Sequence, residues 1–226
     1  GNGDEYIAYI FAGGESSAAT ARSVDFDGTG DYLSVGSSSD FTMGTGDFTI
    51  EGWAIYTDDA NRGLFHISNN PGGLSTAIAG SIGMGHNSSS SNRFQIFANG
   101  SSSNYIDYVM TIGQWFHFAV VRASGVLKVY INGIEKFSIS DTSNYDGTYA
   151  AVGGYYTTSY LMKGNISNFR VVKGTAVYTS SFKPPTEPLT NITNTKLLCC
   201  NGDLATSSTV TPGTITANGD THATGT

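Results

Sequence analysis

An acidic, glycine-rich run near the start of the chain has the composition of a cation-binding turn. The sequence of residues 25–31 is DFDGTGD. Carboxylates at alternating positions, with glycines between them, let several oxygen atoms turn toward one hard cation such as Ca²⁺. The run is not an EF-hand, because the twelfth position counted from Asp25 is Gly36 rather than a glutamate. The pattern offers Asp27 and Asp31 as candidate ligands of a single Ca²⁺.

The same residues also fit a turn without a metal. Aspartate side chains accept hydrogen bonds from backbone amides two residues further along the chain, and glycine supplies the positive φ that such turns need. In this interpretation Asp27 stabilises the glycine-rich turn that follows it. Both interpretations stay open from the sequence.

The acidic residues of the expected strands do not form a catalytic pair. Glu51 lies in the segment Phe48–Ile55, and the next acid along the chain is Asp58. Glycoside hydrolysis needs two carboxylates about 5–10 Å apart, so a lone glutamate does not support it.

The histidines show no catalytic spacing either. His117 lies between Phe116 and Phe118 with no acid beside it in the sequence, which is typical of a buried, satisfied histidine. His66 and His86 have no recognisable serine or cysteine nucleophile, and no metal-binding histidine spacing occurs. We therefore expect that the protein is not an enzyme.

Tyrosines are concentrated in the region from residue 144 to residue 160, beside asparagine and serine. Exposed aromatic rings can pack on the C–H face of a sugar, while amides and hydroxyls bind its OH groups. The alternative is that the rings pack on the sandwich edge or on a neighbouring subunit. The candidate glycan or subunit contacts are Asn144, Tyr145, Tyr155, Tyr156 and Tyr160.

Alternation of apolar and polar residues, interrupted by Gly, Ser and Asn, indicates many short antiparallel strands and almost no helix. The clearest hairpin is centred on Asn132-Gly133, because a type I′ turn needs positive φ at both central residues. The expected strands are 23–27, 32–35, 48–55, 63–67, 93–98, 105–109, 115–122, 126–132, 134–139, 149–153, 164–173 and 196–200. About a dozen strands at this spacing favour a β-sandwich.

The composition restricts the class of partner. The 226 residues carry a net charge of −7, and we find no basic stripe, so the chain is expected to repel nucleic-acid backbones. There is no apolar run of 18 residues, so membrane insertion is not expected. Cys199 and Cys200 are adjacent, and neighbouring strand residues point to opposite faces, which favours two reduced thiols, one in the core and one outside.

An ordered series of short motifs resembles the laminin G-like (concanavalin A-like) jelly-roll family over roughly residues 22–200. The motifs are FDGxxDYL at 26–33, DFTIEGW at 47–53, WxHxAVVR at 115–122, VYING at 129–133, GNISNFRV at 164–171 and FxPP at 182–185. The resemblance implies an all-β, two-sheet antiparallel jelly-roll sandwich, carbohydrate-binding or adhesive use and, in some members, one bound Ca²⁺. In that fold the acidic turn faces the strand 165–168, which adds Asn168 to the candidate ligands Asp27 and Asp31.

Three further segments resemble structural proteins of marine bacteriophages. They are KGTAVY at 173–178, YIAYIFA at 6–12 and PGTITANGD at 212–220. The resemblance implies an N-terminal strand and linker (1–21) from an upstream module, a jelly-roll domain (22–205) and a C-terminal polar connector (206–226). It also implies a structural and adhesive module on the virion surface, with other virion subunits, copies of itself and host-surface glycans as partners. The alternative is a stand-alone secreted carbohydrate-binding lectin.

Overall fold

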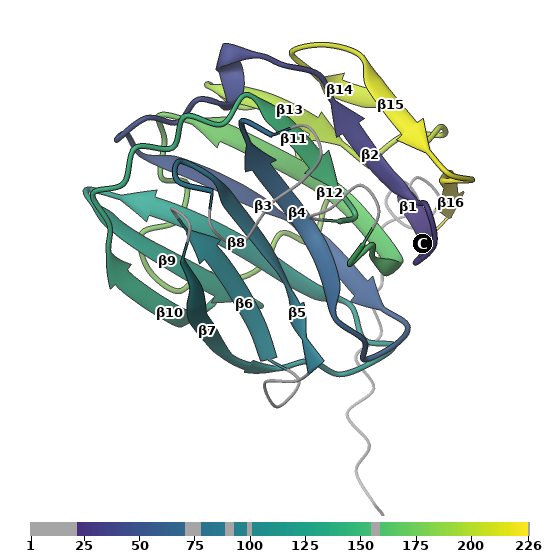
Figure 1. Cartoon of the computed structure of the whole chain (residues 1–226), viewed down its shortest axis with the longest axis horizontal. Helices are drawn as coiled ribbons and strands as arrows, with labels where there is room; N and C mark the ends of the chain where they lie inside the picture. Colours follow the sequence, from purple (N-terminus) through teal and green to yellow (C-terminus); the bar gives the residue numbers. More distant parts are fainter. Residues whose placement is uncertain (1–21, 71–77, 89–92, 99–100, 155–158, 226) are drawn as a thin grey trace, which may run out of the picture.

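The protein is an all-β sandwich of two antiparallel sheets, as expected (Figure 1). The computed structural model describes residues 22–70, 78–88, 93–98, 101–154 and 159–225. A 3₁₀ turn spans Ser39–Phe41, and these ranges contain no α-helix. No helix among the described residues is long and apolar enough to cross a membrane. The predicted strand at 6–11 lies outside these residues.

Nine of the described strands form the first sheet, and its central strands are covered on both faces. Its main path is β10 (Ile134–Ser140), β9 (Val126–Ile131), β8 (Phe116–Ala123), β3 (Phe48–Tyr56), β12 (Lys163–Lys173), β1 (Arg22–Asp27) and β16 (His222–Gly225). From β12 the sheet branches to β13 (Thr195–Cys199) and then β14 (Ser208–Val210).

Seven of the described strands form the second sheet. Their order is β15 (Ile215–Asn218), β2 (Tyr32–Val35), β11 (Tyr149–Val152), β4 (Arg62–Ser68), β5 (Ile82–Asn87), β6 (Arg93–Ala98) and β7 (Ser101–Val109). Alternate residues of both sheets point inward and pack into one hydrophobic core. The large fully buried rings of that core include Phe26, Phe65, Phe94, Phe118 and Phe169.

The outer face of β8 and β9 is covered by an irregular segment, residues 174–194, which we call the covering segment. Its Tyr178 and Phe182 rings stack at 3.6 Å and pack against Ala119, Val121 and Tyr130. This explains why the sequence of β8 is apolar on both faces, as expected for a central, well-covered strand.

Several local predictions are confirmed. Asn132 and Gly133 have φ of 51° and 75°, as the predicted β9–β10 hairpin turn requires. The expected strands 32–35 and 93–98 have the observed bounds of β2 and β6.

Other local predictions are wrong. Strand β5 was not predicted, because Gly83 and Gly85 alternate with its inward residues and hide the apolar period.

Cys199 and Cys200 are both free thiols, as expected, but both are buried, with their sulfur atoms 3.8 Å apart. Cys200 has a φ of 59°, so the two side chains do not alternate as they would along a strand.

The C-terminal residues expected as a polar connector are instead part of the sandwich. Strand β15 pairs with β2 in one sheet, and β16 pairs with β1 in the other, so the hairpin between them ties the sheets together (Figure 1). Within β15, the side chain of Ile215 is buried on the core side of the strand, whereas that of Thr216 is exposed on its outer side. With only one buried apolar residue in β15, the sequence shows no clear alternation of apolar and polar residues, and alternation is what predicts a strand.

Candidate functional site

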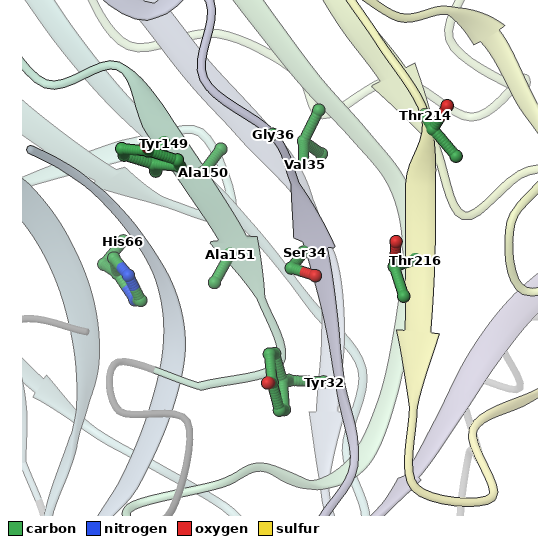
Figure 2. A pocket seen from close by; sticks show the side chains of 10 residues that line it. All are labelled: Tyr32, Ser34, Val35, Gly36, His66, Tyr149, Ala150, Ala151, Thr214 and Thr216. Carbon is green, nitrogen blue, oxygen red and sulfur yellow. The ribbon is translucent and has the colours of Figure 1, made fainter. Parts of the chain in front are cut away.

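The outer face of the seven-stranded sheet carries an open hollow of about 500 Å³ (Figure 2). It lies over β15, β2, β11 and β4. Its lining residues are Tyr32, Ser34, Val35, Gly36, His66, Tyr149, Ala150, Ala151, Thr214 and Thr216. No lysine, arginine or carboxylate is among these lining residues.

Strand register fixes how the polar lining is arranged. Thr216 pairs with Ser34, Ser34 pairs with Ala151, and Ala151 pairs with His66, so these four residues form one row across four neighbouring strands. Ala151, whose side chain is a single methyl group, forms the base of the hollow in the middle of this row (Figure 2). The row therefore brings two hydroxyls and an imidazole ring to one open surface.

Two tyrosines stand on either side of that row. Tyr32 lies two residues before Ser34 on β2, and Tyr149 lies two residues before Ala151 on β11, which runs antiparallel to β2. The tyrosines consequently occupy opposite ends of the hollow (Figure 2). Both are partly exposed. Two aromatic groups and a row of hydroxyls make a surface suited to a polyhydroxylated ligand.

His66 is neutral in this setting. Only 2% of its surface is exposed, and its Nδ1 lies 3.1 Å from the carbonyl oxygen of Gly154. Burial lowers the pKa of His66 to about 4, although the bond to Gly154 opposes that effect. Because a carbonyl only accepts hydrogen bonds, Nδ1 is the protonated nitrogen and Nε2 is an acceptor.

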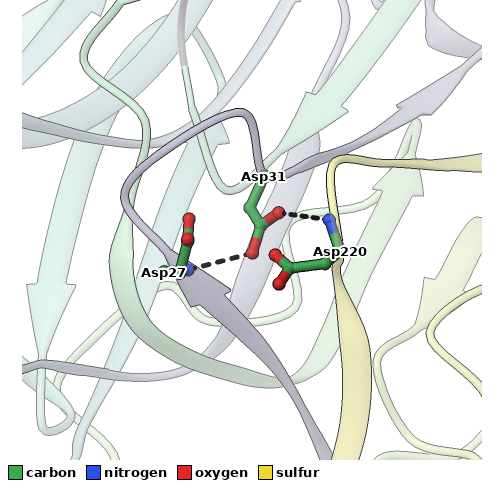
Figure 3. Close-up of side chains that lie close together, drawn as sticks. All are labelled: Asp27, Asp31 and Asp220. Carbon is green, nitrogen blue, oxygen red and sulfur yellow. Dashed lines mark hydrogen bonds between the residues drawn. The ribbon is translucent and has the colours of Figure 1, made fainter.

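A cluster of three aspartates lies where β1, β2 and the β15–β16 turn meet. One oxygen each of Asp27, Asp31 and Asp220 lies within 4.8 Å of the others (Figure 3). Asp31 is buried, whereas Asp27 and Asp220 are exposed. No local sequence pattern indicates Asp220 as a candidate ligand, because its contribution depends on the position of the β15–β16 turn, 189 residues from Asp31.

Asp31 connects the two turns through backbone hydrogen bonds. The amide of Asp27 donates to one of its oxygens at 3.0 Å, and the amide of Asp220 donates to the other at 2.9 Å (Figure 3). Gly219, with a φ of 71°, comes so close that a β-carbon there would lie 2.1 Å from Asp31 Oδ1. The predicted turn contact is also confirmed, since the amide of Thr29 donates to Asp27 Oδ1 at 2.5 Å.

The donor set of this cluster fits a hard cation. Burial raises the pKa of Asp31, and the negative charges of Asp27 and Asp220 raise it further, while the two backbone amides oppose both effects. A cation held by the three carboxylates would offset this repulsion. The cluster adjoins the hollow, because Tyr32 follows Asp31 directly and the Asn218 amide donates to Tyr32 O and Ser34 Oγ.

Asn168 does not join these aspartates. Asp27 pairs with Lys163, so Asn168 lies five residues further along β12. Its side-chain amide donates to Ser167 Oγ at 2.8 Å, and its Oδ1 accepts from the amide of Leu189. The local reason is a bulge at this point of β12, where Asn168 has a φ of 53°. Its side chain holds the covering segment at Leu189 instead.

The structure does not gather the predicted tyrosine contacts into one site. Tyr145 is fully buried, and its OH donates to Asp141 at 2.9 Å, so the prediction that it contacts a glycan or a subunit is wrong. Asn144 is exposed beside Tyr145, at the Ser68 end of β4, whereas the carbonyl of Tyr160 binds the amide of Gly63 at the opposite end. Tyr155 and Tyr156 lie outside the described residues.

A buried polar network beneath the covering segment resembles a catalytic group in composition. Arg170 donates two hydrogen bonds to Glu51 Oε1, at 3.0 and 2.5 Å, and Tyr178 OH donates to Oε2 at 2.8 Å. His117 Nε2 lies 3.3 Å from the same oxygen, so the fold supplies the acid that was missing beside His117 in the sequence. Glu51 and His117 are fully buried, which gives this network a structural role.

The chain belongs to the concanavalin A-like lectin/glucanase superfamily, whose sequence model matches residues 27–177, about two thirds of the chain. A search of curated proteins gives no match. The search of solved structures supports the same fold.

Two of the structural neighbours share most of this fold. A Bacteroides ovatus protein, provisionally described as carbohydrate binding, is 13% identical with a TM-score of 0.66; the match covers 91% of this chain and 60% of that one. The heptameric SAP-like pentraxin of Limulus polyphemus is 17% identical with a TM-score of 0.55, covering 90% and 94%. At these identities the likeness concerns the fold.

Proposed function

We propose that the protein is a non-enzymatic carbohydrate-binding module and that the hollow around Ala151 holds the glycan. The observation that carries this proposal is the joint placement of two tyrosines, two hydroxyls and a neutral imidazole on one open sheet face. The superfamily, and the carbohydrate binding provisionally attributed to the Bacteroides ovatus neighbour, support it.

The same proposal holds that the protein does not cleave the glycan that it binds. The described residues that line the hollow include no carboxylate, whereas glycoside hydrolysis uses two that flank the scissile bond. Glu51 lies in the other sheet and is bound to Arg170. A glycan in the hollow would be bound without being cleaved.

A glycan array on the 226-residue chain, in Ca²⁺ and in EDTA, tests this function. We expect binding by the native chain and its loss in the double variant Tyr32→Ala/Tyr149→Ala. The matched control is Tyr105→Ala, since Tyr105 is exposed on β7 of the same sheet but outside the hollow. Silence of the native chain in both arms, or binding that survives in the double variant, would contradict the proposal.

We propose that Asp27, Asp31 and Asp220 hold one Ca²⁺, which orders the Tyr32 end of the hollow. When bound, the ion would offset most of the negative charge of the three carboxylates. We expect added Ca²⁺ to raise the melting temperature of the native chain, because a ligand of the folded state stabilises it. Asp220→Asn should remove this increase, and Asp107→Asn, at an exposed position on β7, should retain it. Equal increases in both variants would refute the site.

We propose, on the resemblance of residues 173–178 and 212–220, that the module serves adhesion on the surface of a bacteriophage particle. Glycan contact of this kind would suit attachment to a host surface, with other virion subunits as neighbours. A stand-alone secreted lectin is the alternative. The parent gene decides between them: repeated β modules and virion genes beside it support the first, and a secretion signal directly before this domain supports the second.

A further inference from the structure

The separation of the two tyrosines sets the length of ligand that the hollow accommodates. Tyr149 lies opposite Gly36 across the β2–β11 pair, four positions along the strands from Tyr32. At about 3.3 Å per residue this corresponds to roughly 13 Å. A single sugar ring cannot contact both tyrosines at this separation, whereas a short linear chain parallel to the strands can.

The middle of the hollow offers one hydrogen-bond donor and one acceptor. Ser34 Oγ accepts from the amide of Asn218 at 3.2 Å, which leaves its O–H free to donate outward. His66, on the other side of Ala151, uses Nδ1 for Gly154, and the described residues provide no partner for its Nε2. An acceptor that lines the hollow and has no partner among the described residues is available to a donor from the ligand.

The charge around the hollow disfavours an acidic ligand. The described lining residues include no arginine or lysine to pair with a sulfate or carboxylate. At the Tyr32 end, the three carboxylates of Asp27, Asp31 and Asp220 carry more negative charge than one Ca²⁺ offsets, and the whole chain carries −7. An uncharged ligand meets none of this repulsion.

We infer that the hollow selects a linear, uncharged oligosaccharide that runs from Tyr149 to Tyr32, with its central sugar over Ala151 donating a hydroxyl hydrogen to His66 Nε2. This inference rests on the proposed glycan-binding function and adds the chemical class, the length and the orientation of the ligand. His66 is then a specificity-determining residue of the site.

The test measures affinities by calorimetry for linear neutral oligosaccharides of one to six units in the gluco-, manno-, galacto- and xylo-series, with sialylated and sulfated oligosaccharides as the acidic arm. We expect the best neutral trisaccharide to bind at least about tenfold more tightly than its monosaccharide, because the trisaccharide can contact the rings of Tyr32 and Tyr149 at the same time. Acidic oligosaccharides should bind more weakly than neutral ones of equal length.

Variants of His66 test the acceptor. His66→Phe keeps the ring but removes Nε2 and should weaken trisaccharide binding about tenfold, the equivalent of one hydrogen bond. His66→Gln, which retains an acceptor and a donor, should restore most of that loss. The matched control is His86→Phe, because His86 is also buried on this sheet but faces the core. Thermal unfolding confirms that each variant is folded at the temperature of measurement.

The outcomes separate this inference from the proposed function. Tighter binding of the neutral trisaccharide, with His66→Phe weaker and His86→Phe unchanged, supports the inference. Binding at the tyrosines that is equal for the monosaccharide, stronger for acidic chains or indifferent to His66→Phe overturns the inference and keeps the function. No binding of any oligosaccharide by the native chain overturns the proposed function, and the inference with it.

Discussion

Burial shifts the pKa of two side chains at or beside the proposed glycan site. The pKa of His66 falls to about 4 because the charged imidazolium would lose its hydration. The pKa of Asp31 rises for the corresponding reason, since burial disfavours its anion and two neighbouring aspartates add repulsion. His66 lines the hollow, and Asp31 lies in the aspartate cluster that adjoins it, so a neutral acceptor and a concentration of negative charge occur at separate points.

The lowered pKa of His66 predicts a pH-dependent loss of stability. The unfolded chain takes up a proton near pH 6.5, whereas the folded chain does so only near pH 4. Stability from this residue is therefore complete above about pH 6.5 and declines by up to about 3 kcal/mol as the pH falls to 4. Urea unfolding at pH 7, 5 and 4 should show a smaller decline for His66→Gln. Parallel declines in both proteins would contradict this assignment.

At the scale of elements, the covering segment is held to the nine-stranded sheet by hydrogen bonds to a buried ion pair: Tyr178 OH donates to Glu51, and Arg170 donates to the carbonyl of Thr190. Burial opposes the charge of Glu51, but its contacts with His117, Arg170 and Tyr178 outweigh this effect, so the pKa of Glu51 lies below its ordinary value. Tyr178 comes from the covering segment, whereas Glu51 and Arg170 come from β3 and β12. The ion pair therefore fixes where the segment lies.

Removing one partner of this pair should strongly destabilise the fold. Arg170→Met leaves the Glu51 carboxylate buried without its counter-ion, which typically costs about 3–5 kcal/mol. The control is Lys128→Met, since Lys128 pairs with Glu135 at 2.8 Å on the exposed surface, where solvent screens an ion pair and its contribution to stability is small. Guanidinium unfolding measures both. Similar losses in the two variants would contradict a strong contribution of the buried pair to the stability of the fold.

Local patterns in the sequence predicted most strands, but not the long-range arrangement of the site. The β9–β10 turn and β2 follow from short-range chemistry, since Asn-Gly and alternating residues specify them directly. Asp220, in contrast, meets Asp31 only because β15 and β16 return to opposite sheets. The hollow requires the register of four strands, and no single segment of sequence contains that information. Tyr145 was predicted as an exposed contact residue for the same reason. Its ring is buried because it packs edge-on against Phe48, which is distant in the sequence.

At the scale of the whole molecule, the C-terminal hairpin closes the sandwich by contributing one strand to each sheet. Ile215→Ala should lower the melting temperature by about 5 °C or more, because a buried isoleucine contributes about 2 kcal/mol or more and each kcal/mol corresponds to roughly 2–4 °C. Thr216→Ala, on the exposed face of the same strand, should leave it nearly unchanged. Equal melting temperatures for Ile215→Ala and the native chain would mean that β15 adds little to the fold.

The most direct test of the glycan-binding account is a map of the bound ligand on the folded chain. Amide chemical shifts of the isotope-labelled protein would be recorded during titration with the tightest-binding neutral oligosaccharide. We predict shifts concentrated at Tyr32, Ser34, His66, Tyr149 and Thr216, on four neighbouring strands of one sheet. Shifts confined to the β7 edge or to the outer face of the nine-stranded sheet would contradict the account and place the glycan elsewhere.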